Sequence, residues 1–328
     1  MGRHLVGELS RRGVKSFCVN RGKTYWNTES NPAVRADRFR DRSTYREAVR
    51  NLVLSSKHRW LGVVDFCAYE VEDIRDSLPR EIFDIMPIYV FISTDSVYEV
   101  FDEIGAQVRV DETITSDESA AVTPSRDEYG WNKLLCEKYL YENKGEYCRP
   151  IFLRLPDVLG TYDDTLRLWA LWLWIESGFP MKLENPKQIV SFCAAEDVAV
   201  VIVKCLTIPE VPSGPFNIAC DEDQWTMTEF VKEMGCGLGI GRGRFMRLLP
   251  SVDHRNAPLD CSKARKYLEF KPTPLREVIE KCIEWFDCAK DEFHKQFEEC
   301  LCKLPRQVRS EYCHKMGLST PSSSSDSD

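Results

Sequence analysis

Residues 88–98 read IYVFISTDSVY, and this stretch decides the fold. Its first five residues, Ile88 to Ile92, form an unbroken apolar run with the composition of a buried strand. Ser93 and Thr94 follow directly, at the strand end where open α/β sheets bind their ligands. The stretch therefore predicts a buried parallel strand that carries hydroxyl groups to one edge of a sheet.

Segments of the same kind recur on both sides of this strand. We predict strands at residues 14–20, 62–66, 88–93 and 151–155, and helices at 44–54 and from 129 to about 143. Strands that alternate with helices at this spacing indicate a doubly wound parallel sheet, so the predicted fold class is α/β.

The pattern loosens after Pro156. Helices are predicted at 166–177, 196–206 and 274–288, with a short strand at 216–219. The first of these helices contains Trp169, Trp172 and Trp174, and we expect it to pack one face on the sheet or to line a pocket. From residue 291 onward we expect a charged helix and then a disordered tail rich in Ser and Asp, up to residue 328.

Tyr129 and Lys133, in the run YGWNK, lie one helical turn apart and so share a helix face. A free phenol, with a pKa near 10, is a poor acid or base at neutral pH. A nearby ammonium group favours the phenolate, so we expect Lys133 to lower the pKa of Tyr129. Thr94 could then share a substrate oxygen with the phenol while the carbinol hydrogen leaves as hydride. The alternative is that this spacing arises by chance, as it does in many helices.

Composition narrows the class of protein. The 328-residue chain is 43% hydrophobic and carries a net charge of −8, which argues against a generally basic nucleic-acid binder while leaving room for a local basic patch. The 14 cysteines show no metal-ligand spacing, so we predict no metal site and interpret them as reduced thiols. No leader or membrane-spanning run is recognisable, and we expect a soluble, cytoplasmic protein.

Several ordered motifs carry a resemblance to a known family. They are STDSVY, YGWNK, FLRLPDVLG (152–160), AAEDVA (194–199), FNIA (216–219) and PLDCSKARKYLEFKPTPLREVI. The chain resembles the extended short-chain dehydrogenase/reductases of the NAD(P)-dependent epimerase/dehydratase family over about residues 2–290. The resemblance implies a Rossmann-type dinucleotide-binding domain at 1–156, completed by about 193–222, and a mainly substrate-binding lobe at 157–290. It also implies a small-molecule substrate such as a sugar nucleotide, and homodimers.

The same resemblance implies a catalytic triad of Thr94, Tyr129 and Lys133, in which Lys133 also holds the nicotinamide ribose. Dehydratases of this family continue the strand with an acidic pair. Here Asp95 is present as a further catalytic candidate, but Ser96 stands where a glutamate is expected, so dehydratase chemistry is not favoured. Ser96 and Arg167 are the candidate substrate contacts. A looser likeness around VVDFCAYEVEDI, to a branch that includes chloroplast RNA-binding proteins, offers a non-catalytic nucleotide-sensing or RNA-associated scaffold as the alternative function.

The family's fingerprint Gly-x-x-Gly-x-x-Gly separates its first strand from its first helix. Gly2 resembles the last of these glycines, whereas the first strand and the other two glycines have no counterpart. Without that strand, the strands at 14–20 and 62–66 are expected to face a gap with unpaired backbone groups. A truncated gene product, a short isoform and a protein with another segment in this position would each explain the difference. We favour truncation, and expect weak or absent dinucleotide binding and impaired activity.

The remaining cofactor residues are also assigned by resemblance. The strand at 14–20 ends in Asn20, and the loop after it carries Arg21 and Lys23 where NAD-preferring members place an acidic residue. Because cations suit a 2′-phosphate, NADP is favoured over NAD, although both side chains could equally be solvated loop cations. The other cofactor candidates by position are Asp37, Arg38, Ala68 and Val158.

Overall fold

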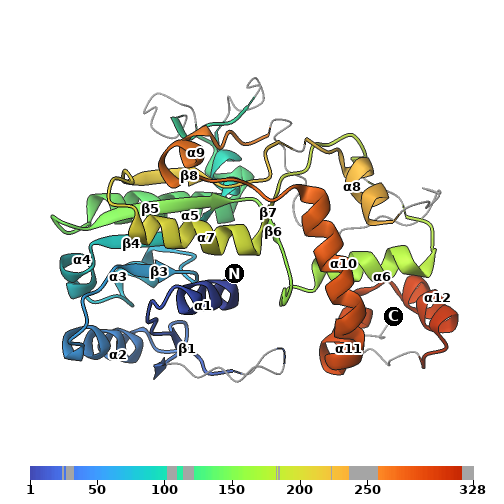
Figure 1. Cartoon of the computed structure of the whole chain (residues 1–328), viewed down its shortest axis with the longest axis horizontal. Coiled ribbons are helices and arrows are strands. Elements are labelled where there is room, and N and C mark those ends of the chain that lie inside the picture. Colours follow the sequence, from blue (N-terminus) through green and yellow to red (C-terminus); the bar gives the residue numbers. More distant parts are fainter. Residues whose placement is uncertain are drawn as a thin grey trace. The chain divides into compact units, whose positions relative to one another are not determined.

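The computed structural model describes residues 1–23, 26, 33–101, 109–113, 122–181, 183, 185–222, 224–235 and 258–319. It divides into two compact units (Figure 1). The first unit comprises the described residues of Met1–Val158, Ser191–Asp221 and Asp253–Pro272, and the second those of Leu159–Val190, Glu222–Val252 and Thr273–Asp328. This division differs from the predicted domains at residues 258–272, which we had assigned to the second lobe.

A parallel four-stranded sheet forms the centre of the first unit. Its order is β3-β4-β5-β8, where the strands are β3 (Val63–Asp65), β4 (Ile88–Thr94), β5 (Arg149–Leu155) and β8 (Gly214–Asn217). Two further parallel strands, β1 (Val19–Asn20) and β2 (Val34–Arg35), pair only with each other among the described strands. β6 (Asp157–Leu159) pairs with β7 (Phe192–Ala194). The predicted doubly wound parallel α/β sheet is confirmed.

Alternation along β4 explains the two layers of helices. Ile88, Val90 and Ile92 point into a core shared with α1 (Gly2–Arg11) and α7 (Ala195–Thr207). Tyr89 and Phe91 point into the opposite core. The helices of that layer are α2 (Arg42–Ser55), α3 (Val71–Arg75), α4 (Glu81–Ile85) and α5 (Glu128–Glu142).

The remaining elements of the first unit are short. The 3₁₀ helix η1 (Asp95–Tyr98) follows β4, η4 (Pro124–Arg126) precedes α5, and α9 (Ser262–Leu268) packs near β8 and α7. The strand predicted at 14–20 is regular only over β1. Residues 15–18 belong to no ladder among the described residues, and a strand is regular only where it pairs with a neighbour.

The described part of the second unit consists mainly of helices: α6 (Arg167–Ser177), α8 (Met227–Met234), α10 (Leu275–Glu292), α11 (His294–Lys303) and α12 (Arg306–Met316). The tryptophan helix α6 packs against α10, α11 and α12, and Trp169 stacks on Phe286 with ring centroids 5.8 Å apart. Whether this helix packs on the sheet or lines a pocket stays a prediction. The single charged helix expected after residue 291 is two helices, α11 and α12, with Pro305 between them. The predicted disordered tail rich in Ser and Asp lies outside the described residues.

None of the described helices combines the length and apolar character that a bilayer crossing needs.

Candidate functional site

The predicted triad comes together where β4 ends and α5 begins. Thr94 is the last residue of β4, and its hydroxyl oxygen accepts a 3.2 Å hydrogen bond from the Ser96 backbone N–H. Helix α5 begins at Glu128, and its N-cap Asp127 accepts a 2.8 Å bond from the Gly130 backbone N–H. Tyr129 therefore lies in the first helical turn and Lys133 one turn later, as predicted.

Gly130 lets this helix approach the end of β4. A Cβ atom added at Gly130 would overlap the backbone carbonyl of Ser96 and lie 3.1 Å from the Val97 backbone nitrogen. Only a residue without a side chain permits that approach. The close contact places the Tyr129 phenol beside Thr94, near enough for the threonine to affect the pKa of the phenol. Asp95 is buried next to them and accepts a 3.4 Å bond from the Thr94 hydroxyl, while Ser96 is half-buried.

A buried charge pair fixes α5 to the sheet further along. Glu137 on α5 accepts hydrogen bonds from the Ser93 hydroxyl at 2.6 Å and from Arg154 Nε at 3.1 Å. All three side chains are buried, and Arg154 comes from β5. The pair holds the helix that carries Tyr129 and Lys133 at a fixed height on the sheet.

The Lys133 ammonium group lies at the centre of the site. Its side chain is buried, and Nζ donates to the backbone oxygens of Ala68 at 2.7 Å and Ile92 at 2.9 Å. Nζ also lies 4.7 Å from the ring centroid of Phe91, 5.0 Å from that of Tyr69 and 5.8 Å from that of Tyr129. Burial lowers the pKa of Lys133.

The expected lowering of the Tyr129 pKa is not found. Loss of water around the inner part of the phenol is the largest effect and raises the pKa of Tyr129 to about 12, although 45% of the residue stays exposed, and the neighbouring phenol of Tyr69 adds to the rise. The nearby hydroxyl of Thr94 lowers the pKa by less than these effects raise it. In the ligand-free site Tyr129 is therefore a protonated phenol at neutral pH.

Asp65, at the end of β3, organises the neighbouring loops. Its carboxylate accepts two bonds from Arg38, at 2.9 and 3.0 Å, one from the Tyr89 hydroxyl at 2.7 Å and one from the Cys67 backbone N–H at 2.9 Å. Burial raises the pKa of Asp65, but Arg38 outweighs this and the pKa is lowered overall. Arg38, predicted to contact the cofactor, is buried and directs both terminal nitrogens to Asp65, so it ties residues 36–41 to the sheet.

The other cofactor candidates lie on loops of the first unit. Asn20 ends β1, and its side-chain oxygen accepts a 2.8 Å bond from the backbone N–H of Gly22. Gly22 has a φ of +66° and lies against the Arg35 guanidinium, so Arg35 joins the exposed Arg21 and Lys23 as a third cation. Arg35 was not among the residues predicted from the sequence.

Three predicted residues remain to be placed. Asp37 accepts a 3.1 Å bond from the Phe39 backbone N–H. Val158 on β6 is half-buried and packs on the core beneath α1 and α7. Gly2 begins α1, whose first turn carries no acidic side chain, and space around it is open. Arg167, in the second unit, donates from Nε to the Thr165 hydroxyl at 3.2 Å, and its role as a substrate contact stays a prediction.

Two of these residues could contact a dinucleotide at the carboxyl edge of the sheet, although the first two glycines of the fingerprint have no counterpart. The helix end at Gly2 can receive an anion, and the buried Nε of Arg38 has no hydrogen-bond partner among the described residues.

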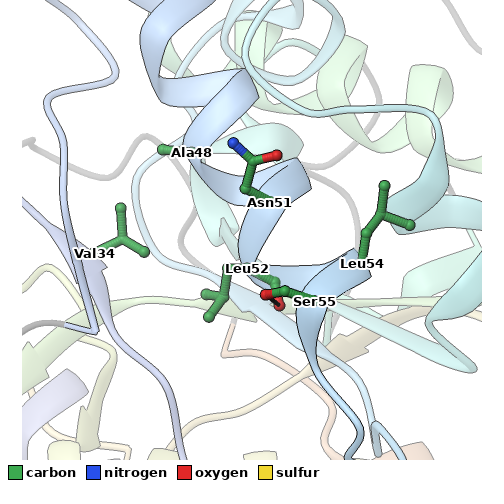
Figure 2. A pocket seen from close by; sticks show the side chains of 6 residues that line it. All are labelled: Val34, Ala48, Asn51, Leu52, Leu54 and Ser55. Atoms are coloured by element: carbon green, nitrogen blue, oxygen red, sulfur yellow. Dashed lines mark hydrogen bonds between the residues drawn. The ribbon is translucent and has the colours of Figure 1, made fainter.

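Among the described residues, no three His, Cys, Asp or Glu side chains gather as metal ligands would. A pocket between β2 and α2, lined by Val34, Ala48, Asn51, Leu52, Leu54 and Ser55, holds no titratable group and offers no acid or base (Figure 2).

Comparisons with known proteins identify one matching family model and several proteins of similar fold. Residues 80–219 match the model of the NAD dependent epimerase/dehydratase family. The chain is similar in fold to a UDP-glucose 4-epimerase from Thermotoga maritima, solved with UDP-glucose, at 18% identity and a TM-score of 0.65 over 88% of this chain and 96% of that one. It is also similar to a putative epimerase from Burkholderia cenocepacia, at 16% identity and a TM-score of 0.66 over 88% and 95% of the two chains.

A third similar structure is the Bordetella bronchiseptica enzyme WbmG in complex with NAD and UDP, at 14% identity and a TM-score of 0.60 over 88% of this chain and 91% of that one. No curated protein sequence matches the chain. At these identities the solved structures show the fold.

Proposed function

We propose that the protein is an NAD(P)-dependent, epimerase-like oxidoreductase. The premise is that residues 80–219 form a domain of the NAD dependent epimerase/dehydratase family. The substrate we propose is a sugar nucleotide with a free carbinol. One observation carries the proposal: Thr94, at the end of β4, is close enough to the Tyr129 phenol to affect its pKa, and the Lys133 ammonium lies 5.8 Å from the centroid of the phenol ring. Two different elements supply these groups, which chance spacing along one helix does not explain.

Each side chain has a distinct task. Thr94 and Tyr129 would both bond the carbinol oxygen and hold it between them. Tyr129 would move the proton: it donates to the oxygen when a carbonyl is reduced and accepts from it when a carbinol is oxidised. Lys133 would orient the ribose of the cofactor next to the phenol. When bound, the nicotinamide supplies the site that accepts or returns the hydride.

The protonation state of the ligand-free site suits the half of the reaction in which a carbonyl is reduced. A phenol with a pKa of about 12 carries its proton at neutral pH, so Tyr129 can donate it. Oxidation of the carbinol requires the phenolate, so bound substrate and cofactor must lower the pKa of Tyr129 before a UDP-sugar is oxidised.

The cation cluster at Arg21, Lys23 and Arg35 supports NADP as the preferred cofactor. Three guanidinium or ammonium groups at the end of β1 suit the 2′-phosphate, and no carboxylate of the described residues 19–23 would bond a free 2′-hydroxyl. The described cysteines are all free, which supports a reducing compartment such as the cytoplasm.

The test is turnover of a panel of UDP-sugars by the purified chain with NAD⁺ and NADP⁺, following reduced cofactor and sugar interconversion. Tyr129→Phe should lower kcat/KM by about 10²- to 10⁴-fold, because it removes the proton-transfer group. Tyr141→Phe, an exposed tyrosine on the same helix, is the matched control. The native protein should bind NADP⁺ more tightly than NAD⁺. Turnover that survives Tyr129→Phe, or a native protein that binds nucleotides without turnover, would exclude the proposed reaction; the second result would favour a non-catalytic module.

A further inference from the structure

The carboxylate of Asp65 holds the β3 bend, which we define as residues 65–68. Its Oδ1 accepts hydrogen bonds from two successive backbone N–H groups, that of Cys67 at 2.9 Å and that of Ala68 at 3.2 Å. Arg38 donates two further bonds to the same carboxylate, at 2.9 and 3.0 Å, and both side chains are buried. A buried carboxylate with charged and backbone donors on both of its oxygens is held in one orientation. The backbone of the β3 bend is therefore fixed at the end of the strand.

The last residue of the β3 bend binds the catalytic-site lysine. Ala68 is fully buried, and its carbonyl oxygen accepts a 2.7 Å hydrogen bond from Lys133 Nζ. Asp65 itself pairs with Arg38 and makes no ion pair with Lys133. Asp65 therefore reaches the ammonium group through the backbone of the bend, whose N–H groups it binds on one side and whose carbonyl group binds Lys133 on the other.

Asp65 also acts on Lys133 through its charge. Burial is the largest effect on the ammonium and lowers the pKa of Lys133, whereas the Asp65 carboxylate has the largest opposing effect and raises it. Of the charged groups around Lys133, Asp65 thus affects it most. The other titratable groups that face the ammonium are Cys67, Cys136, Glu137, Tyr69 and Tyr129.

We propose that Asp65 is a positioning residue, which holds the Lys133 ammonium beside Tyr129 by fixing the bend that ends in Ala68. The proposal rests on the proposed function, in which Lys133 orients the ribose of the cofactor, and it adds a residue that acts through another. Without the fixed bend, Nζ would lose its 2.7 Å acceptor and would open more often to water.

The two effects of Asp65 can be separated by the choice of substitution. Asparagine keeps an oxygen that can accept from the Cys67 and Ala68 N–H groups, but it carries no charge. Alanine removes both the acceptor and the charge. A change that appears with alanine and not with asparagine therefore reports the geometry of the bend, and a change common to both variants reports the charge.

The experiment is NMR of the ligand-free full chain labelled with ¹³C- and ¹⁵N-lysine, in which the Lys133 signals are assigned by their loss in Lys133→Arg. In Asp65→Ala, exchange of the Lys133 ammonium hydrogens with water should accelerate about tenfold or more, because a hydrogen bond to a charged group is lost. In Asp65→Asn the exchange rate should stay close to that of the native chain. The pKa of Lys133, followed by its carbon signal, should fall in both variants.

Asp221→Ala is the matched control, because Asp221 is also a buried carboxylate of the first unit and is paired with Arg265. This control should lose stability and leave both Lys133 readings unchanged. If Asp65→Ala does not fold, judged by its thermal unfolding, the double variant Arg38→Met/Asp65→Ala is measured in its place, since it removes both members of the buried ion pair.

A native exchange rate in Asp65→Ala would overturn the proposal. Equal acceleration in the alanine and asparagine variants would assign the effect to charge alone, and equal acceleration in Asp221→Ala would assign it to lost stability; either result would overturn the positioning role. These readings need neither cofactor nor turnover. A native protein that turns over no UDP-sugar would therefore refute the proposed function, while the exchange rates would still decide whether Asp65 holds Lys133.

Discussion

Replacing Gly130 by alanine tests the geometry of the site most directly. The added methyl group would overlap the Ser96 carbonyl, and the Val97 backbone nitrogen would lie 3.1 Å away. Both neighbours are backbone atoms of the segment that follows β4, so no side-chain rotation relieves the overlap. Helix α5 and η1 must therefore move apart, by about 1 Å.

That displacement has two measurable effects. Overpacking of this kind costs about 1–3 kcal/mol of folding free energy. Tyr129 and Lys133 belong to α5, whereas Thr94 belongs to β4. Displacement of α5 would therefore move the phenol away from the threonine hydroxyl. A misplacement of about 1 Å in a catalytic arrangement can lower the rate about 100-fold, or about 2.7 kcal/mol in the barrier.

The assay compares kcat/KM and thermal unfolding of Gly130→Ala with those of the native chain, using the substrate found in the turnover screen. Gly7→Ala is the matched control, because Gly7 lies in α1 with nothing within 4 Å of an added Cβ. That control should be neutral or slightly stabilising, by about 0.5–1 kcal/mol. A Gly130→Ala protein with native rate and stability would show that α5 does not need its close approach to the end of β4, and the site geometry described above would be refuted.

Two further predictions concern charge. Glu137→Gln leaves the buried Arg154 without its carboxylate, so the free energy of unfolding, measured by chemical denaturation, should fall by about 3 kcal/mol or more. Glu142→Gln, at an exposed position of the same helix, should have little effect, and equal stabilities of the two variants would contradict the buried pairing. Because burial raises the pKa of Tyr129 to about 12, its proton is held more tightly than the proton of a free phenol. The tyrosinate absorbance of the ligand-free protein should match that of Tyr129→Phe up to about pH 11, and an extra titration with a midpoint below 10 would disprove the assigned environment.

The strands and the triad could be predicted because their signals are local. The apolar run of β4 and the hydroxyl residues after it are contiguous, and helical spacing alone places Tyr129 and Lys133 on one face. Strand limits were less predictable, since pairing decides them. The strand expected at 216–219 lies at 214–217, where its backbone is in register with residues 151–154 of β5.

Residues brought in from other segments could not be predicted. Nothing near Tyr69 in the sequence indicates that its ring approaches both Phe39 and Tyr129, because three separate chain segments meet there. Arg35 was missed for the same reason: its contact with Gly22 depends on the pairing of β1 with β2. Pro305, in contrast, was a visible signal for the break between α11 and α12, because a proline disfavours helix in the residue before it.

The pKa of Tyr129 is raised and not lowered, which changes the role assigned to Lys133. From the sequence, we expected Lys133 to act as an isolated positive charge next to the phenol, which would stabilise the phenolate. In the structure its ammonium is directed at two backbone oxygens, from the segment after β3 and from β4, and these dipoles oppose its field. Lys133 thus ties α5, β4 and the loop that carries Tyr69 into one rigid site. A ligand that drew the ammonium away from those carbonyls would let its charge act on the phenol, and this would couple proton transfer at Tyr129 to binding.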